Sequence, residues 1–214
     1  MAMVEKVTRV DDAYARLKQE ILLNRMPAGA LAPEPEIAER LAMSRTPVRE
    51  ALIKLEAEGR VELVPRRGAR VLSVSEEDMS EIYSILTALE PEAAADLARR
   101  GGDADALAPL DAATNAMEQA LVDDDLDAWA AADDQFHRML LALHGNRRMT
   151  AMAGQLYDQA HRARMVTLRL RAKPERSTQD HRAMLERLRA GDPDGVRAAT
   201  ELLSVIETLR LPQL

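Results

Sequence analysis

Hydrophobic positions in the first part of the chain recur every three or four residues. Tyr14, Leu17 and Ile21 follow this spacing, which places them on one face of a helix. The same spacing, interrupted by prolines and glycines, predicts three helices over residues 11–25, 36–41 and 44–58. Pro47 lies in the first turn of the third helix, where its missing N–H costs no hydrogen bond, and Gly59 is expected to end that helix.

The pattern then changes from helical spacing to alternation. Residues 60–64 largely alternate polar and apolar side chains, and residues 69–74 do so more loosely. The segment between them, Pro65-Arg66-Arg67-Gly68, is typical of a turn, so the pattern predicts a β-hairpin with a basic tip. Three helices followed by a hairpin are the elements of a winged helix-turn-helix, which we expect over residues 1–74.

From residue 75 onward the chain is expected to be helical. Ser75 is followed by three acidic residues, which is typical of a capped helix start because negative charge stabilises the first turn. Short breaks rich in Gly, Asn, Asp and Pro separate six predicted helices, at residues 76–100, 104–122, 126–143, 147–171, 177–190 and 194–210. Helices joined by such short turns pack as an antiparallel bundle. The predicted fold is therefore mainly α, with a winged helix-turn-helix over residues 1–74 and an all-helical domain over residues 75–214.

The composition supports a helical core and excludes several kinds of site. Hydrophobic residues make up 47% of the chain but aromatic residues only 2%, so Ala, Leu, Met and Val must fill the core. The absence of cysteine excludes disulfides, zinc–thiolate sites and cysteine nucleophiles. No apolar run approaches the roughly 18 residues that cross a membrane, and the N-terminus has no apolar segment like that of a signal peptide. We expect a soluble protein of the cytoplasm.

The net charge of −7 is unevenly distributed along the chain. Residues 1–74 carry 13 basic and 11 acidic side chains, a net charge of +2, whereas the remaining residues carry 16 and 25, a net charge of −9. An acidic body with a basic end suits a protein that contacts DNA through that end. Such asymmetry is common among domains, so it supports DNA binding only together with a motif.

The third predicted helix carries the residues best suited to read DNA. On a helical wheel, Val48, Leu52 and Leu55 share the arc that would pack on the other helices, whereas Arg45 and Arg49 lie beside it and face outward. Each of these arginines can present a fork of hydrogen-bond donors to guanine or to phosphate. An isolated pair of arginines usually only solvates a helix surface. Here the pair comes with a helix-turn-helix order and a basic hairpin tip, so DNA binding is the stronger interpretation.

Two stretches resemble the GntR family of bacterial regulators. Residues 36–59, EIAERLAMSRTPVREALIKLEAEG, are similar to its helix-turn-helix, and residues 65–71, PRRGARV, are similar to its wing. The resemblance implies that the DNA-binding residues are Ser44, Arg45, Thr46, Arg49, Arg66, Arg67 and Gly68. The family often has an arginine just before its second helix, where this chain has Pro35, so a contact that relatives make there with the DNA backbone is not expected here.

Asp133 and His137 lie four residues apart on one predicted helix, so both side chains project from one face and could bind one metal ion. Residues 75–210 resemble the FCD effector domain of the FadR-like branch of the GntR family. Metal-binding members of this branch use an aspartate and three histidines. The resemblance therefore implies that His181 joins Asp133 and His137.

Two polar positions of the family's pocket are leucines in this chain. Leu203 stands where the family's spacing places the last histidine, and Leu86 stands where its first bundle helix commonly carries an arginine. Three interpretations stay open: a Zn, Mn or Ni ion held by three protein ligands plus water or effector, a site that recruits another group such as His161, and an apolar pocket in which the histidines are hydrogen-bonded core residues. The residues expected to line the effector pocket are Asp133, His137, His181 and Leu203.

These features predict a DNA-binding transcriptional regulator and not an enzyme. The resemblance implies a homodimer, usually a repressor, that binds a pseudo-palindromic operator in double-stranded DNA and responds to a small organic effector. Apolar faces of the helical domain, with Ile82, Leu86, Leu89 and residues 93–97 among them, are expected to hold the dimer together. Two other classes stay open. One is a metal-dependent hydrolase, which would need a catalytic motif that the chain lacks, and the other is a helical module whose winged helix binds protein.

Overall fold

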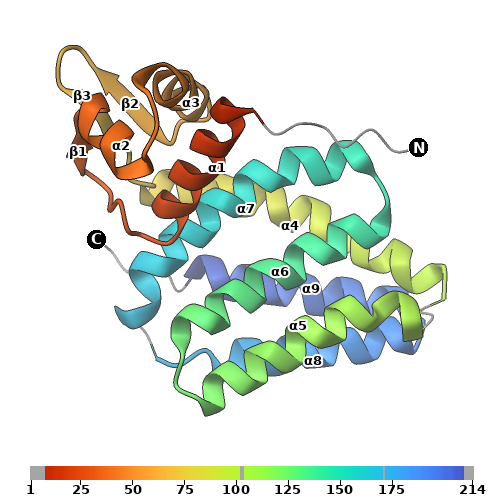
Figure 1. Ribbon diagram of the computed structural model, residues 1–214. Helices are drawn as coiled ribbons and strands as arrows, with labels where there is room; N and C mark the ends of the chain where they lie inside the picture. Colours follow the sequence, from red (N-terminus) through yellow and green to blue (C-terminus); the bar gives the residue numbers. More distant parts are fainter. Residues whose placement is uncertain (1–7, 102–103, 171, 210–214) are drawn as a thin grey trace. The chain divides into compact units, whose positions relative to one another are not determined.

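A computed structural model describes residues 8–101, 104–170 and 172–209 (Figure 1). These residues are mainly helical, which confirms the predicted fold class. The chain divides into two units, Met1–Ser73 and Val74–Leu214. None of the helices described is long and apolar enough to cross a membrane.

The first unit contains the three expected helices, α1 (Arg9–Leu22), α2 (Glu34–Leu41) and α3 (Arg45–Ala57). Helix α1 begins before the predicted residue 11 because the hydroxyl of Thr8 accepts a hydrogen bond from the backbone N–H of Asp11 at 3.1 Å. It ends before residue 25, since Asn24 has a left-handed backbone with a φ of 54°. Ala42 also has a left-handed backbone, and it forms the predicted tight turn between α2 and α3.

A three-stranded antiparallel sheet completes the first unit. The predicted hairpin is confirmed: β2 (Val61–Val64) pairs with β3 (Gly68–Val71), with Val64 opposite Gly68. The sequence did not predict β1 (Leu31–Ala32), which pairs with the other edge of β3. Because β1 immediately precedes α2, this pairing ties the start of α2 to strand β3 of the hairpin.

All six predicted helices of the second unit are present. They are α4 (Glu76–Arg99), α5 (Ala104–Val122), α6 (Leu126–His144), α7 (Arg147–Thr167), α8 (Glu175–Arg189) and α9 (Pro193–Leu209), with a 3₁₀ turn at Leu168–Leu170. The capped start at Ser75 is confirmed, since its hydroxyl accepts from the backbone N–H of Asp78 at 3.0 Å.

Helix α6 is central to the second unit because it packs against α4, α5 and α7. Its apolar residues Trp129, Phe136 and Leu140 are fully buried in the larger of two hydrophobic clusters. The smaller cluster lies mainly between α4 and α7 and contains Leu86 and Tyr157. Polar groups on α6 that face these clusters are therefore removed from water.

The residues expected to hold a dimer are instead mostly part of this core. Ile82, Leu86 and Ala93 of α4 are all buried within the unit. That part of the prediction is wrong, because the apolar stripe of α4 packs on its own neighbouring helices. Ile85 is an exposed large apolar residue of this helix, with 44% of its surface accessible.

Candidate DNA-binding surface and metal centre

Helix α3 buries one face and exposes the other, as its sequence predicts. Val48, Leu52 and Leu55 are buried in the core of the first unit. Arg45 and Arg49 are exposed, and so are Thr46 and the N-cap residue Ser44. The unit thus presents two guanidinium groups and two hydroxyls together at the N-terminal end of an exposed helix face.

A shallow depression on this face brings α2 and α3 together. It is lined by Glu34, Arg45, Thr46, Arg49, Glu50 and Ile53. Glu34 had no predicted role, yet its Oε1 atom lies 3.4 Å from Nη1 of Arg49. The sequence signal was weak, since an acidic residue at a helix start is ordinarily explained by the helix dipole alone.

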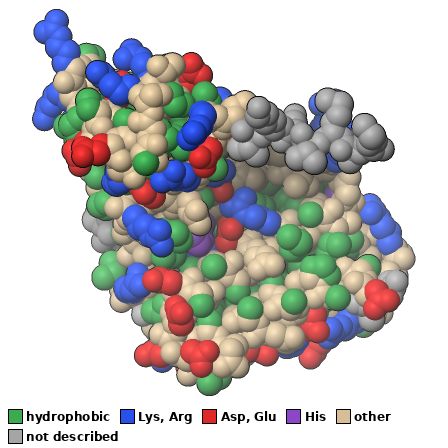
Figure 2. Space-filling view, in the orientation of Figure 1, with side chains coloured by type: hydrophobic (Ala, Val, Ile, Leu, Met, Phe, Trp, Pro, Cys, Tyr) green, Lys and Arg blue, Asp and Glu red, His purple; other side chains and the backbone are tan. Residues whose placement is uncertain are grey.

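The tip of the β2–β3 hairpin is basic. Arg66 and Arg67 are exposed, and Figure 2 shows Lys and Arg side chains gathered at the end of the first unit that carries this loop. Gly68 has a φ of 105°, and a Cβ atom built on it would overlap the carbonyl oxygen of Ala32 and lie 2.6 Å from Cα of Pro33. Position 68 therefore requires glycine because of its packing against β1 within the protein, whether or not DNA also approaches it.

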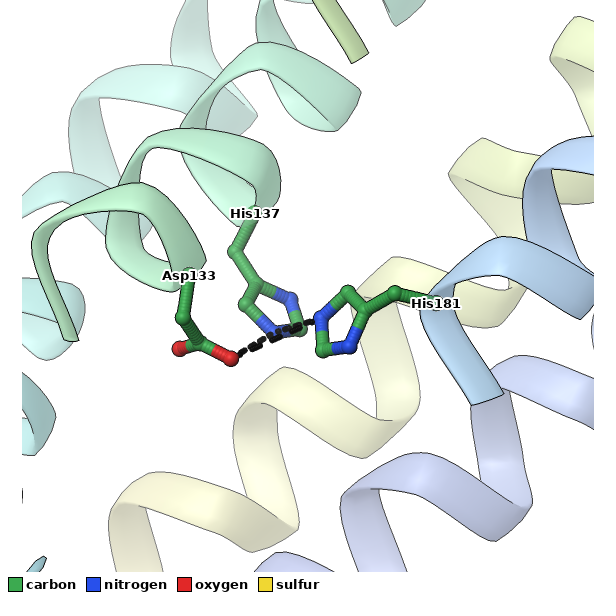
Figure 3. A group of neighbouring side chains, drawn as sticks. All are labelled: Asp133, His137 and His181. Atoms are coloured by element: carbon green, nitrogen blue, oxygen red, sulfur yellow. Dashed lines mark hydrogen bonds and ion pairs between the residues drawn. The ribbon is translucent and has the colours of Figure 1, made fainter. Parts of the chain in front are cut away.

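In the second unit, Asp133 and His137 of α6 and His181 of α8 point toward one another (Figure 3). All three are buried. The two Nε2 atoms of His137 and His181 are 3.3 Å apart. Oδ1 of Asp133 lies 3.5 Å from Nε2 of His181 and 3.9 Å from Nε2 of His137. The structure thus brings together the three candidate metal ligands that the sequence spacing and the family resemblance imply.

Neighbouring groups favour the ring tautomer that can bind a metal. Nδ1 of His181 lies 2.7 Å from the carbonyl oxygen of Ser177, which can only accept, so Nδ1 carries the proton. Nδ1 of His137 lies 3.2 Å from Oε1 of Glu90, which favours a proton there as well. Both neutral rings then present the Nε2 lone pair inward. This is how partners outside the coordination shell usually orient metal-binding histidines.

The spacing of these atoms fits a tetrahedral ion such as zinc. Ligand atoms about 2.0–2.1 Å from zinc lie about 3.3–3.4 Å apart in a tetrahedron. Two of the three separations, 3.3 and 3.5 Å, are close to this value. Oδ1 of Asp133 is buried and accepts no hydrogen bond from the residues described. A buried acceptor without a donor is costly, and a bound cation would satisfy it.

Without a metal ion, a proton on His137 can supply part of the positive charge beside Asp133 that the metal would otherwise bring. Burial opposes the charged ring, but the carboxylates of Glu90 and Asp133 outweigh it and raise the pKa of His137 to about 9. The imidazolium could then donate from Nε2 toward His181. Burial likewise opposes the charge of Glu90, whose pKa is nevertheless lowered by His137 and by the hydroxyl of Tyr157, which donates to Glu90 at 2.7 Å.

A small cavity of about 20 Å³ lies beside His137. Its walls are formed by Tyr83, Leu86, Glu90, Asp134, His137, Tyr157, Ala160, Arg164 and Leu203. Of the four predicted pocket residues, His137 and Leu203 line it, while Asp133 and His181 are held against His137. Leu86 and Leu203, the two leucines at positions where the resemblance implies polar residues, thus both line the cavity. One water molecule needs about 10–15 Å³, so no organic effector fits without movement.

The prediction missed the polar residues around this cavity. Glu90 could have been found as a carboxylate among the apolar residues of α4, since such a residue is rarely buried without a partner. Arg164 carried no comparable signal because α7 contains many arginines. His161 is also buried on α7, but it lies outside the group of potential metal ligands found in the described residues. His144 is near a helix end, where it contacts Asp96 at 3.3 Å.

Comparison with known proteins identifies both units. Residues 9–71 match the family model described as bacterial regulatory proteins, gntR family, and residues 81–203 match the FCD domain. A transcriptional regulator of the HTH type from Agrobacterium vitis, in the TAR-I ttuE-ttuC′ intergenic region, is 43% identical over 65% of this chain and 82% of its own length. Another, from an unstable DNA locus of Streptomyces ambofaciens, is 30% identical over 98% of this chain and 88% of its own.

Two further relatives support this assignment. The HTH-type transcriptional repressor GlaR of Escherichia coli (strain K12) is 30% identical over 74% of this chain and 73% of its own length. The structure of E. coli McbR/YncC, which is 23% identical, has the same fold with a TM-score of 0.85 over 97% of this chain and 98% of that one. The chain therefore belongs to the GntR family of bacterial transcriptional regulators, which are DNA-binding proteins and not enzymes, and it carries the C-terminal FCD domain of the FadR-like branch.

Proposed function

We propose that this regulator reads operator DNA with Arg45, Thr46 and Arg49 and steadies the complex with the wing. The observation that carries the proposal is the position of these side chains, exposed at the N-terminal end of α3 above a fully packed helix face. An exposed helix of this kind enters the major groove, where an arginine fork matches guanine. Ser44 suits a phosphate contact, as do Arg66, Arg67 and the backbone at Gly68.

Base contacts and phosphate contacts differ in how they depend on sequence and salt. Arg45→Ala or Arg49→Ala should weaken binding to an operator duplex that the protein selects from a random pool by about 1–3 kcal/mol. The same changes should leave binding to a duplex of random sequence nearly unchanged. Arg66→Ala and Arg67→Ala should weaken binding to both duplexes and reduce the slope of log K against log salt. Fluorescence anisotropy with the two duplexes at several salt concentrations measures both effects. Normal operator binding by an Arg45/Arg49 double variant would contradict the assignment.

The second unit is proposed to bind an effector beside a divalent metal ion. Asp133, His137 and His181 would hold the ion beside the cavity that His137, Leu86 and Leu203 line. The metal would supply a Lewis-acidic position for an oxygen of the effector. The two leucines would favour an effector with an apolar portion. This part rests on the converging lone pairs and on the buried Oδ1 of Asp133.

The small volume of the cavity suggests how effector binding would change the arrangement of the helices. An effector larger than one water molecule must separate side chains of α4, α6 and α7, which carry most of the cavity wall. Close-packed helices respond to an inserted group by shifting as units rather than by deforming locally. A shift of this kind in each protomer of a two-fold dimer would change the spacing of the DNA-binding units and hence operator affinity.

We further infer that the protein acts as a homodimeric repressor on a pseudo-palindromic operator in the cytoplasm. GlaR, RspR of E. coli and a D-xylose utilization regulator of Paenarthrobacter nicotinovorans are each named as repressors or a probable repressor. Exposed apolar residues of the helical unit, Ile85 on α4 and Val166 on α7, are suited to a subunit interface. Sedimentation of the full chain tests the dimer, and a monomer at micromolar concentration would contradict it.

A further inference from the structure

Glu34 places a carboxylate on the proposed DNA-binding face of the first unit. Its Oε1 atom lies 3.4 Å from Nη1 of Arg49, and the two side chains differ in exposure. The Arg49 side chain is 65% exposed, whereas that of Glu34 is only 15% exposed. The guanidinium therefore rests against a carboxylate that is largely enclosed. A negative charge on a face that meets phosphates opposes binding, so its presence there calls for a compensating role.

The segment that carries Glu34 is stiff. Glu34 lies between Pro33 and Pro35, whose rings restrict the backbone on both sides. The preceding strand β1 pairs with β3, and Pro33 lies against Gly68, beside the turn at the tip of the hairpin. As the first residue of α2, Glu34 also has a carboxylate that the helix dipole stabilises. The backbone that carries this carboxylate is thus fixed by the sheet and the helix.

A fixed carboxylate can restrict the orientation of a mobile arginine. A long exposed arginine side chain has many rotamers, and in the absence of a partner it turns toward whichever phosphate is nearest. Contact through Nη1 engages one part of the guanidinium and leaves other N–H donors available for a base edge. Preorganisation of this kind lowers the entropy lost when the base contact forms.

We propose that Glu34 is a specificity-determining residue that positions Arg49 toward a base edge and discourages its contact with phosphate. The inference rests on the proposed function, in which α3 reads the major groove. Glu34 acts through Arg49, because its carboxylate orients the guanidinium, and this raises the ratio of operator affinity to random-duplex affinity. Its charge by itself weakens binding to DNA of any sequence and leaves that ratio unchanged.

Two roles of Glu34, general repulsion of DNA and positioning of Arg49, predict opposite changes in operator affinity when its carboxylate is neutralised. If Glu34 only repels DNA, Glu34→Gln tightens binding to operator and to random duplex equally. If Glu34 positions Arg49, the same change tightens binding to random duplex but weakens binding to operator. The ratio of the two affinities should then fall about tenfold, which is within the range for a misplaced bidentate base contact.

The test uses the full chain, an operator duplex that this chain selects from a random pool, and a scrambled duplex of the same length. Glu36→Gln is the matched control, because Glu36 lies on the same helix, is exposed and forms no ion pair among the residues described. The control should tighten binding to both duplexes and leave the ratio unchanged. Thermal unfolding of each variant verifies that the first unit is folded.

A double-mutant cycle identifies the residue through which Glu34 acts. In an Arg49→Ala background, Glu34→Gln should no longer lower the affinity ratio. Glu34→Asp keeps the charge but withdraws the carboxylate, so it should give an intermediate ratio without tightening binding to scrambled duplex. Glu34→Gln that behaves like Glu36→Gln, or that lowers the ratio equally without Arg49, would overturn the inference while leaving the recognition helix intact. Normal operator binding by Arg49→Ala alone would overturn the proposed function as well.

Discussion

Oδ2 of Asp133 lies 2.6 Å from Nη1 of Arg164, and both side chains are buried, with 1% and 7% of their surfaces exposed. Arg164 thus engages one carboxylate oxygen and leaves Oδ1 to face the two histidines. The pair joins α6 to α7 at the wall of the cavity. It therefore links the helix that carries two candidate metal ligands to a helix that forms part of the cavity wall.

Removal of the arginine should leave an uncompensated charge in the core. Arg164→Met is expected to lower the free energy of unfolding of the second unit by about 3–5 kcal/mol, because breaking a buried ion pair costs far more than the pair contributes. Arg169→Met is the matched control, since Arg169 pairs with Asp127 at 2.7 Å but both side chains are more than half exposed. The control should cost at most about 1 kcal/mol. Urea unfolding measures both, and equal losses would show that Arg164 does not stabilise a buried charge.

The raised pKa of His137 predicts a loss of stability in mild alkali for the metal-free protein. The folded pKa of about 9 lies above the unfolded value of 6.5, so the contribution is fully present below pH 6.5 and disappears as pH rises through about 9. The chelator-treated protein should lose on the order of 2–3 kcal/mol across this window if only this group changes its proton occupancy.

The variant His137→Gln separates this effect from other titrations. It should be less stable than the wild type at pH 6, yet nearly constant in stability between pH 6.5 and 9. Thermal melts in chelator at half-unit pH intervals provide the comparison. Parallel curves for the two proteins would mean that His137 is neutral in the folded, metal-free state.

Two glycines with left-handed backbones should respond very differently to alanine. Gly68→Ala forces a Cβ atom into the backbone of Ala32 and Pro33, whereas the Cβ atom of Gly59→Ala meets nothing within 4 Å. We expect Gly59→Ala to cost about 1–2 kcal/mol from backbone strain alone. Gly68→Ala should cost more, because β1 must also move away from β3. Unfolding of the first unit, followed by circular dichroism, distinguishes them, and equal costs would contradict the close packing at Gly68.

Elements set by local interactions were predictable from the sequence. The start of α4 depends on Ser75 and Asp78, which are three residues apart, and the turn after α3 depends on Gly59. Strand β1 was not predictable, because two residues carry no periodicity and Leu31 becomes a strand only by pairing with Arg70. The end of α1 was misplaced for a similar reason, since a left-handed Asn24 resembles any other polar residue in a helical pattern.

In the candidate site, too, only the features set by local spacing or by the family resemblance were predictable. Asp133 and His137 could be paired from their spacing on one helix, and the family resemblance added His181. His181 is oriented locally by Ser177 of its own helix, but the partners of His137 and Asp133 come from other helices at large sequence separation, Glu90 on α4 and Arg164 on α7. Nothing local in those segments indicates which carboxylate or guanidinium reaches α6. The size of the cavity depends on how tightly these helices pack, and no single segment encodes that distance.

Leu203 is the position at which the metal hypothesis can be tested most directly. It lines the cavity together with His137, and the resemblance to metal-binding members of the family implies a histidine at its position. Leu203→His should add an imidazole to the three candidate ligands, because the resemblance places the last histidine of metal-binding members at this position of the cavity wall. Zinc affinity should then rise by at least about tenfold and resist a competing chelator, since a fourth protein ligand replaces water. Leu86→His, at the other apolar wall, is the matched control and should not raise affinity. Titration with zinc in the presence of a competing indicator measures the zinc affinity of each variant, and elemental analysis after equal metal exposure measures occupancy.

Metal in both wild type and Leu203→His would support the three-ligand site, whereas metal in the variant alone would favour an apolar pocket in the natural protein. Stoichiometric metal in neither would contradict the assignment of Asp133, His137 and His181 as ligands.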